Sequence, residues 1–189
     1  DKLVTTDTRK ITPGCIFFAL KGPNFNGNKF AKDALTKGAK FAIIDQKEFF
    51  VEGKTILVKD VLATLQELAQ FHRNQFKIPV IGITGTNGKT TTKELIGVVL
   101  SSKYNTLITE GNLNNHIGVP LTLLKINSKH EIAIIEMGAS KIGDIKELAE
   151  IAMPTHGIIT NIGKAHLEGF GSFEGVIKAK SELYNYIKE

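Results

Sequence analysis

The sequence predicts an α/β fold, in which a small α/β unit is followed by a mostly parallel sheet with helices on both faces. Short apolar runs rich in β-branched residues alternate with segments whose apolar residues recur at helical spacing. Strands that alternate with helices favour a parallel sheet, because each helix returns the chain to the same end of the sheet. The length of 189 residues and the hydrophobic content of 42% suit one large or two small globular domains.

The N-terminal α/β unit is expected to span residues 1–77. Three short apolar runs predict strands, and two segments with apolar residues on one helical face predict helices. The expected elements are strand 16–20, helix 30–37, strand 41–44, strand 55–58 and helix 61–76.

The second unit is expected to span residues 78–189 and to begin with a buried strand at 78–83. Further elements follow in the same alternation. They are helix 93–100, strands 106–109 and 131–136, helix 142–151, strand 156–161 and helix 173–187. The chain stops at the end of a helix, where an open sheet of this type usually continues, so we expect this domain to be truncated.

A glycine-rich segment joins the first strand of the second unit to its first helix. The segment consists of Gly85, Thr86, Asn87, Gly88, Lys89, Thr90 and Thr91. Glycines at positive φ let consecutive backbone N–H groups face an anion, and the helix that follows directs its N-terminus at the same place. We expect Lys89 to reach the β- and γ-phosphates of a nucleotide and Thr90 to bind Mg²⁺. The generic spacing would need glycine in place of Ile83, so the alternative is a turn without a ligand.

Three further residues of the second unit are candidates for the same site. Glu136 ends an apolar strand, and the carboxyl ends of parallel strands share one edge of the sheet with the phosphate loop. Its carboxylate is therefore a candidate Mg²⁺ ligand, the alternative being an ordinary charge at a strand end. His166 lies on a glycine-rich loop at that edge, and a lone loop histidine is more often a bystander. Periodicity alone predicts that Lys180, on the last helix, is exposed to solvent.

An asparagine-rich segment, residues 111–120, is open to two interpretations. Its candidate binding residues are Asn112, Asn114 and Asn115. They could form a turn in which Asn115 caps a helix, or they could present amides to a sugar or a peptide. Composition leaves both interpretations open.

Composition and charge argue against several classes of protein. The net charge of +5 comes from scattered lysines, and Arg9 and Arg73 are the only arginines, so we expect no nucleic-acid partner. No apolar run approaches the roughly 20 residues needed to cross a bilayer, so we expect no membrane insertion. Cys15 is the single cysteine and lies in an apolar run, which indicates a buried thiol and a reducing, cytoplasmic location.

Two sets of motifs resemble the Mur ligases, the ATP-dependent amide-forming enzymes of peptidoglycan synthesis. Residues 84–91, Thr-Gly-Thr-Asn-Gly-Lys-Thr-Thr, are similar to the phosphate loop of this family, whose spacing departs from the generic pattern. Asp7-Thr8-Arg9, followed by residues 14–22, is similar to the N-terminal Asp-Ser-Arg signature, with threonine in place of serine. The resemblance extends over nearly the whole chain.

Within the family, three segments most resemble the members that add D-alanyl-D-alanine to UDP-MurNAc-tripeptide. These segments are residues 111–122, 136–140 and 160–172. Members that add the third peptide residue are the alternative, but they usually carry other residues at 114–115 and 165–168. A non-catalytic nucleotide-binding module is a second alternative. A folylpolyglutamate-synthase-like ligase would lack the N-terminal domain.

The resemblance implies a set of roles for named residues. Residues 1–77 would bind the UDP-sugar and residues 78–189 would bind ATP, with a third, C-terminal domain absent and the chain alone inactive. Lys89 and the phosphate loop would hold the phosphates, and Thr90 and Glu136 the first Mg²⁺. His166 and Lys180, the latter carbamylated, would hold a second Mg²⁺. The substrate-binding residues would be Thr8, Arg9, Asn112, Asn114 and Asn115. The expected catalytic residues are Lys89, His166 and Lys180, in a monomer.

Overall fold

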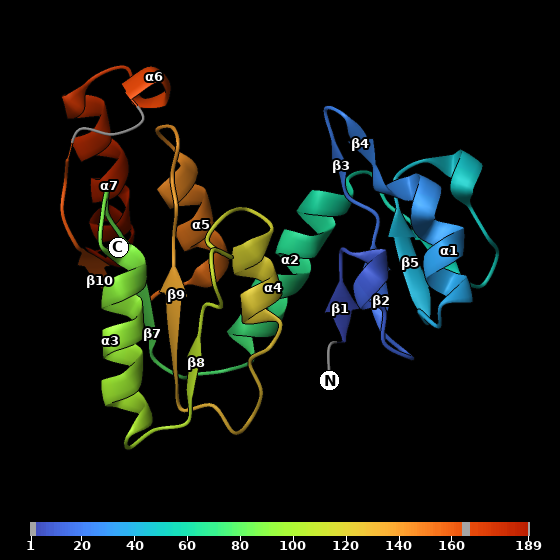
Figure 1. Cartoon of the computed structure of the whole chain (residues 1–189), viewed down its shortest axis with the longest axis horizontal. Coiled ribbons are helices and arrows are strands. Elements are labelled where there is room, and N and C mark those ends of the chain that lie inside the picture. Colours follow the sequence, from blue (N-terminus) through green and yellow to red (C-terminus); the bar gives the residue numbers. More distant parts are fainter. Residues whose placement is uncertain (1–2, 164–166, 189) are drawn as a thin grey trace. The chain divides into compact units, whose positions relative to one another are not determined.

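The computed structural model describes residues 3–163 and 167–188, and the chain divides into two compact units (Figure 1). Unit 1 comprises Asp1–Glu67 and unit 2 comprises Leu68–Glu189. The division lies within helix α2 (Val61–Asn74). The boundary expected between residues 77 and 78 stays a prediction.

Unit 1 is built on a parallel sheet with the strand order β1-β2-β5-β6. Its strands are β1 (Val4–Thr5), β2 (Ile16–Phe18), β5 (Phe41–Ile44) and β6 (Thr55–Leu57). Helix α1 (Ala31–Thr36) packs against β5. Alternate residues of β2 and β5, among them Phe17 and Ile44, point into the core of this unit. Cys15 belongs to the same core, so the expectation of a buried thiol is confirmed.

Several short elements of unit 1 have no counterpart in the sequence-based prediction. They are the antiparallel hairpin of β3 (Lys21–Gly22) and β4 (Phe25–Asn26), and the 3₁₀ helices η1 (Thr8–Lys10), η2 (Gly27–Phe30) and η3 (Lys47–Phe49). Each is two to four residues long. A segment of that length is too short to show a hydrophobic period.

Unit 2 is built on a second parallel sheet with the order β10-β7-β9-β8. Its strands are β7 (Val80–Thr84), β8 (Thr106–Ile108), β9 (Ile132–Glu136) and β10 (His156–Ile159). In Figure 1 β9 stands between β7 and β8, although β8 precedes it along the chain. The carboxyl ends of all four strands therefore meet at one edge, as the alternation of strands and helices predicts.

Helices cover both faces of this second sheet. They are α3 (Lys89–Ser101), α4 (Gly118–Leu123), α5 (Asp144–Ala152) and α7 (Phe173–Lys188), while the short helix α6 (Leu167–Phe170) contacts α7. Helix α3 packs on β7, β8 and β9, whereas α5 and α7 pack on each other and α7 also contacts β10. Along β9, Ala133 and Ile135 enter the core that contains α4, α5 and α7, and Glu136 contacts α3. The expected α/β fold is confirmed.

The main differences from prediction in unit 2 concern helices at the edge of the sheet. Helix α3 begins at Lys89, one turn before the expected start, because Gly88 supplies the left-handed residue that opens it. Helix α4 follows the asparagine-rich turn, where a helix capped by Asn115 was one of two interpretations and no bounds were predicted. It forms where Gly118 packs so closely on the backbone of Leu113 that a β-carbon would overlap it, and local sequence does not report such a contact.

No helix within residues 3–163 and 167–188 combines the length and the apolar composition that crossing a membrane requires.

Candidate functional site

The loop between β7 and α3 has the backbone of an anion-binding turn. Gly85 and Gly88 adopt positive φ angles of 145° and 75°. A β-carbon on Gly85 would overlap the Thr160 hydroxyl, so only glycine fits there. Gly88 immediately precedes α3, and the first N–H groups of this helix are available to a ligand. The loop can therefore present several N–H donors to a phosphate.

The residues that follow β10 hold this loop in shape. Thr86 donates its N–H to the Asn161 carbonyl over 3.0 Å, and Asn87 donates to Asn161 Oδ1 over 3.0 Å. The Thr160 hydroxyl donates to the Asn87 carbonyl over 2.6 Å. No role was predicted for Thr160 and Asn161 from the sequence. Their position after a strand at the shared sheet edge was the only signal that could have identified them.

The side chains of the first helical turn lie beside the loop. The Lys89 ammonium donates to the carbonyls of Gly85 and Thr86 over 2.8 and 3.1 Å. A cation held across the loop is well placed to meet the charge of a phosphate there. Thr90 donates its hydroxyl to Glu136 Oε2 over 3.1 Å, whereas Thr91 is exposed on the same turn.

Glu136 is almost completely buried, with 1% of its surface exposed, and polar groups surround its carboxylate. In addition to Thr90, Asn114 donates its amide to Oε1 over 2.8 Å. The Lys93 ammonium lies 3.8 Å from Oε2. The structure thus brings together Thr90 and Glu136, two of the residues predicted to bind Mg²⁺, and adds Asn114 and Lys93.

The oxygen atoms of Thr90 and Glu136 are the hard ligands that Mg²⁺ prefers. Among residues 3–163 and 167–188, no three His, Cys, Asp or Glu side chains converge on one point. A Mg²⁺ ion at Glu136 would therefore complete its coordination with phosphate oxygens and water, as Mg²⁺ usually does in nucleotide sites. The side chains present fit such a shared site.

Lys180 is buried, with 3% of its surface exposed, so the expectation of an exposed lysine from periodicity alone was wrong. Its ammonium lies 5.5 Å from the centroid of the Phe170 ring. The pKa of Lys180 is lowered to about 8, mainly by burial and also by the Lys89 ammonium, while Asp144 and Glu182 oppose the shift. The neutral, nucleophilic amine is then more populated near neutral pH than in an ordinary lysine, although the protonated form still predominates. His166, the other predicted ligand of a second metal ion, lies outside the described residues.

The three asparagines of residues 111–120 have different surroundings. Asn114 contacts Glu136, as described above. Asn115 Oδ1 accepts from the N–H groups of Ile117 and Gly118 over 3.1 and 2.9 Å, at the turn that leads into α4. Asn115 thus closes a turn before the helix, as one of the two interpretations expects, but the N-cap position of α4 itself is Ile117. Asn112 is exposed.

Unit 1 contains a cavity of about 370 Å³ beside η1. Its lining residues are Thr6, Asp7, Thr8, Arg9, Phe17, Phe25 and Phe30. Arg9 donates from Nε and Nη2 to the two carboxylate oxygens of Asp7 over 3.0 and 2.8 Å. These hydrogen bonds lower the pKa of Asp7 to about 2. The predicted pair Thr8 and Arg9 therefore lines a cavity in which the guanidinium is held in one orientation.

Two exposed phenylalanines in the same cavity were not predicted. The rings of Phe25 and Phe30 stack with centroids 5.6 Å apart and planes 11° from parallel. Exposed apolar rings beside an arginine are typical of a site for a planar, anionic ligand. In sequence they were two of 11 phenylalanines, without a pattern to mark them.

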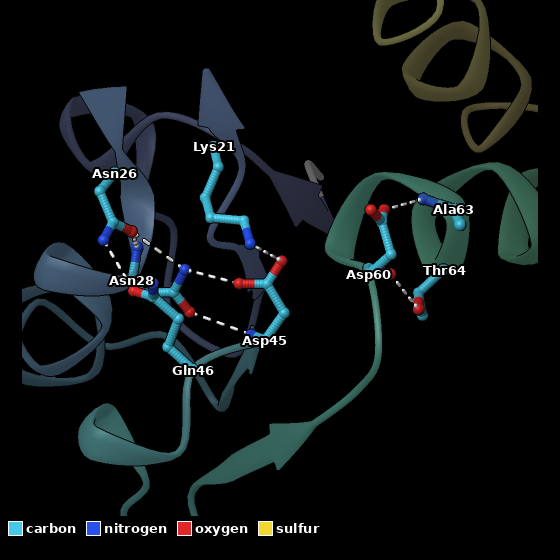
Figure 2. A network of polar contacts seen from close by, with 8 residues as sticks. All are labelled: Lys21, Asn26, Asn28, Asp45, Gln46, Asp60, Ala63 and Thr64. Carbon is cyan, nitrogen blue, oxygen red and sulfur yellow. Dashed lines mark hydrogen bonds and ion pairs between the residues drawn. The ribbon is translucent and has the colours of Figure 1, made fainter. Parts of the chain in front are cut away.

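A polar network holds the segment that carries these rings (Figure 2). Asn28 donates its amide to Asp45 Oδ1 over 2.8 Å and accepts from the Asp45 N–H over 3.0 Å. Lys21 forms an ion pair with Asp45 Oδ2 at 3.0 Å, and Asn26 donates to Gln46 Oε1 over 2.7 Å. The hairpin and η2, which carry Phe25 and Phe30, are thereby fixed to the end of β5.

Two family models of known proteins together match nearly the whole chain. Residues 83–189 match the family described as Mur ligase middle domain, and residues 2–79 match the Mur ligase family, catalytic domain. A relative from Escherichia coli (strain K12), UDP-N-acetylmuramoyl-tripeptide--D-alanyl-D-alanine ligase, is 44% identical over 186 residues, which cover 98% of this chain and 41% of the relative. The chain thus spans about two fifths of the length of that relative.

Two solved structures are similar to this chain over nearly all its length. The crystal structure of MurF from Acinetobacter baumannii superposes with a TM-score of 0.91 and 39% identity, covering 97% of this chain and 41% of that one. MurF ligase from Thermotoga maritima in complex with ADP gives a TM-score of 0.90 and 36% identity, covering 100% of this chain and 44% of that one.

Proposed function

Because the chain belongs to the Mur ligase family, we propose that the protein carrying it joins D-alanyl-D-alanine to UDP-MurNAc-tripeptide at the expense of ATP. The observation that carries the proposal is the phosphate loop whose Thr90 contacts the buried Glu136 at the sheet edge. The names of the relatives support the choice of substrates, since the E. coli protein is a tripeptide–D-alanyl-D-alanine ligase.

The nucleotide occupies the turn between β7 and α3. Gly85, Thr86, Asn87, Gly88, Lys89, Thr90 and Thr91 form this binding segment. The backbone N–H groups and the N-terminus of α3 bind the phosphates, and Lys89 moves from the loop carbonyls to the β- and γ-phosphates. The bound ADP in the T. maritima structure supports this assignment.

Thr90 and Glu136 would hold a Mg²⁺ ion, and this ion would neutralise phosphate charge and polarise the γ-phosphate. His166 and Lys180 are the proposed ligands of a second Mg²⁺. For this role Lys180 is carbamylated: its neutral amine forms a bond to the carbon of CO₂ and releases a proton. The pKa of about 8 supports this step, because only the neutral amine attacks CO₂. The product is an anionic oxygen ligand.

UDP-MurNAc-tripeptide is the proposed ligand of the cavity in unit 1. In unit 1, Arg9 and Thr8 contact its phosphates and sugar, and the stacked pair of Phe25 and Phe30 offers a flat apolar surface to the base. The remaining proposed contacts come from Asn112, Asn114 and Asn115. Asn114 and Asn115 already form hydrogen bonds within the protein, with Glu136 and with the start of α4. These contacts favour an indirect role of both residues in substrate binding.

The reaction has two steps. The terminal carboxylate of the tripeptide attacks the γ-phosphorus of ATP, so that an acyl phosphate forms and ADP leaves. The amine of D-alanyl-D-alanine then attacks the acyl carbon, and an amide bond forms as phosphate leaves. Lys89 offsets the repulsion between the attacking carboxylate and the γ-phosphate. His166 and Lys180 complete the proposed catalytic set.

Phosphate release by the full-length protein tests this function. Release is expected only when ATP, UDP-MurNAc-tripeptide and D-alanyl-D-alanine are all present. Release with UDP-MurNAc-dipeptide and a single amino acid instead would identify a ligase that adds the third residue. ADP binding without turnover of either set would identify a nucleotide-binding module and contradict the proposal.

We also propose a monomeric, cytoplasmic enzyme. The single cysteine is buried, and a protein without disulfides suits a reducing compartment. Residues 1–189 by themselves are expected to be inactive, since they match only 41% of the E. coli relative. Sedimentation of the full-length protein tests the oligomeric state, and a dimer would contradict this part of the proposal.

A further inference from the structure

Lys93 is a fully buried lysine for which the proposed reaction gives no role. It lies one helical turn after Lys89 on α3, and its side chain has 0% of its surface exposed. An ammonium withdrawn from water needs an opposite charge and acceptors for its three protons. The partners of Lys93 therefore show which parts of the site it connects.

The ammonium of Lys93 contacts the chain that follows β8. It donates to the carbonyl of Thr109 over 2.7 Å and to that of Gly111 over 3.3 Å. These two carbonyls begin the segment that leads to Asn114, whose amide reaches the Glu136 carboxylate. Lys93 thus attaches the asparagine-rich segment to the phosphate-loop helix.

The same ammonium faces two carboxylates. Glu94 Oε1 lies 3.0 Å away and its side chain is 60% exposed, whereas Glu136 Oε2 lies 3.8 Å away in a side chain that is 2% exposed. Thr109 closes the arrangement, because its hydroxyl oxygen accepts from the Glu136 N–H over 3.0 Å while its carbonyl accepts from Lys93. Glu136 is consequently oriented from several sides.

We propose that Lys93 is a positioning residue that sets the Glu136 carboxylate, and the segment carrying Asn114, for Mg²⁺-dependent nucleotide binding. This inference rests on the proposed function, in which Glu136 holds Mg²⁺ beside the nucleotide. Lys89 meets the phosphates, whereas Lys93 acts through Glu136 and does not touch the nucleotide. The alternative is a buried lysine that stabilises the fold and has no specific effect on the metal.

The test is the gain in ADP affinity on adding Mg²⁺, measured by calorimetry on the full-length protein with Mg²⁺ and with a chelator. Lys93→Met keeps the length of the side chain and removes its charge. The Mg²⁺-dependent gain is expected to fall about tenfold or more, as for other residues that orient metal ligands. Binding without Mg²⁺ is expected to change by less than about twofold. Equal weakening under both conditions would show a purely structural role and overturn the inference.

A double-mutant cycle tests whether Lys93 influences Mg²⁺-dependent ADP binding through Glu136. In a Glu136→Gln background, Lys93→Met is expected to change the Mg²⁺-dependent gain by less than about twofold. The losses in melting temperature of the two single variants are also expected to be less than additive, since each removes one end of the same buried pair. Additive effects in both measurements would overturn the inference.

Glu94→Gln is the matched control, because Glu94 contacts Lys93 but is exposed and lies on the helix surface. This variant is expected to leave the Mg²⁺-dependent gain unchanged. If Lys93→Met does not fold, Lys93→Arg is the variant to test, because it keeps a buried cation of different shape. A loss of ADP affinity confined to the Mg²⁺-dependent part supports the inference. An equal loss with and without Mg²⁺ overturns it. Wild-type protein that does not bind ADP even with Mg²⁺ would instead refute the proposed function, and this inference with it.

Discussion

Thr90 and Glu136 are 46 positions apart in the chain, yet the Thr90 hydroxyl donates to the Glu136 carboxylate over 3.1 Å. Thr90 lies in the first turn of the helix after β7, and Glu136 ends β9, the neighbouring strand of the same parallel sheet. The contact joins the helix that follows the glycine-rich loop to a buried negative charge. Several measurable consequences depend on this relationship and on the contacts around it.

Removing the Thr90 hydroxyl is expected to impair turnover. Thr90→Val keeps the shape of the side chain but takes away the oxygen proposed to bind Mg²⁺. Phosphate release by the full-length protein should fall about 10- to 100-fold, whereas Thr90→Ser, which keeps the oxygen, should retain most of the activity. Equal activity of the valine and serine variants would exclude a metal-binding role for this hydroxyl.

Gly85→Ala is expected to abolish ADP binding. The new β-carbon would overlap the Thr160 hydroxyl, and φ at this position is 145°, a conformation that alanine rarely adopts. Strain of about 1–3 kcal/mol should distort the loop. Gly53→Ala is the control, since Gly53 also has a positive φ but open space around it. It should lower the melting temperature without affecting ADP affinity, and loss of binding in both variants would contradict the loop-specific explanation.

Asp144 is expected to make stability depend on pH in the acid range. Burial raises the pKa of Asp144, but hydrogen bonds from the Ser140 N–H, the Lys141 N–H and the Ser140 hydroxyl lower it by more, so the net shift is downward. A lowered folded-state pKa contributes stability above the unfolded value of about 3.9, and this stability is lost as pH falls through the folded-state pKa. Asp144→Asn should therefore destabilise the protein at neutral pH.

Urea unfolding of the wild type and of Asp144→Asn over a range of pH checks this expectation. The difference in free energy of unfolding should be constant at neutral pH and should shrink below about pH 4. A difference that grows on acidification would contradict the direction of the shift.

Lys180 is expected to take up CO₂. Protein incubated with ¹³C-labelled bicarbonate should show a carbamate carbon resonance that is absent from Lys180→Met. Lys178→Met is the matched control, since Lys178 is an exposed lysine on the same helix. A resonance that survives in Lys180→Met, or that disappears in Lys178→Met, would assign the modification to another lysine.

Phe25→Ala is expected to weaken binding of UDP-MurNAc-tripeptide. The variant removes the more exposed ring of the stacked pair in the unit 1 cavity. The exposed fraction is 55% for Phe25 and 39% for Phe30. Stacking of a base on an aromatic ring contributes about 1–3 kcal/mol to binding. Its loss should raise the Kd roughly 5- to 150-fold, as measured by calorimetry. Phe50→Ala, which changes a phenylalanine of similar exposure that does not line the cavity, should bind as the wild type does. Similar affinities for the two variants would exclude a contact with the base.

Local sequence was sufficient to predict the α/β fold and the position of the glycine-rich loop between β7 and α3. Hydrophobic periodicity marks β5 at its observed bounds and most of the longer helices, because each such element buries one face and shows that face in its own residues. The glycines of the loop are informative for the same reason, since the backbone conformation they permit is a local property. Glu136 could be assigned to the site because the strands were expected to be parallel.

The tertiary structure alone decided which side chains surround these residues. Periodicity predicted an exposed Lys180 and no sequence pattern marked Lys93, yet both are buried. Thr109 and Glu136, which Lys93 contacts, lie far from it along the chain. The support of the loop by Asn161 and the stacking of Phe25 on Phe30 likewise depend on chain segments meeting in space. Periodicity records how an element faces the core, but it carries no information on which residue of another element it will contact.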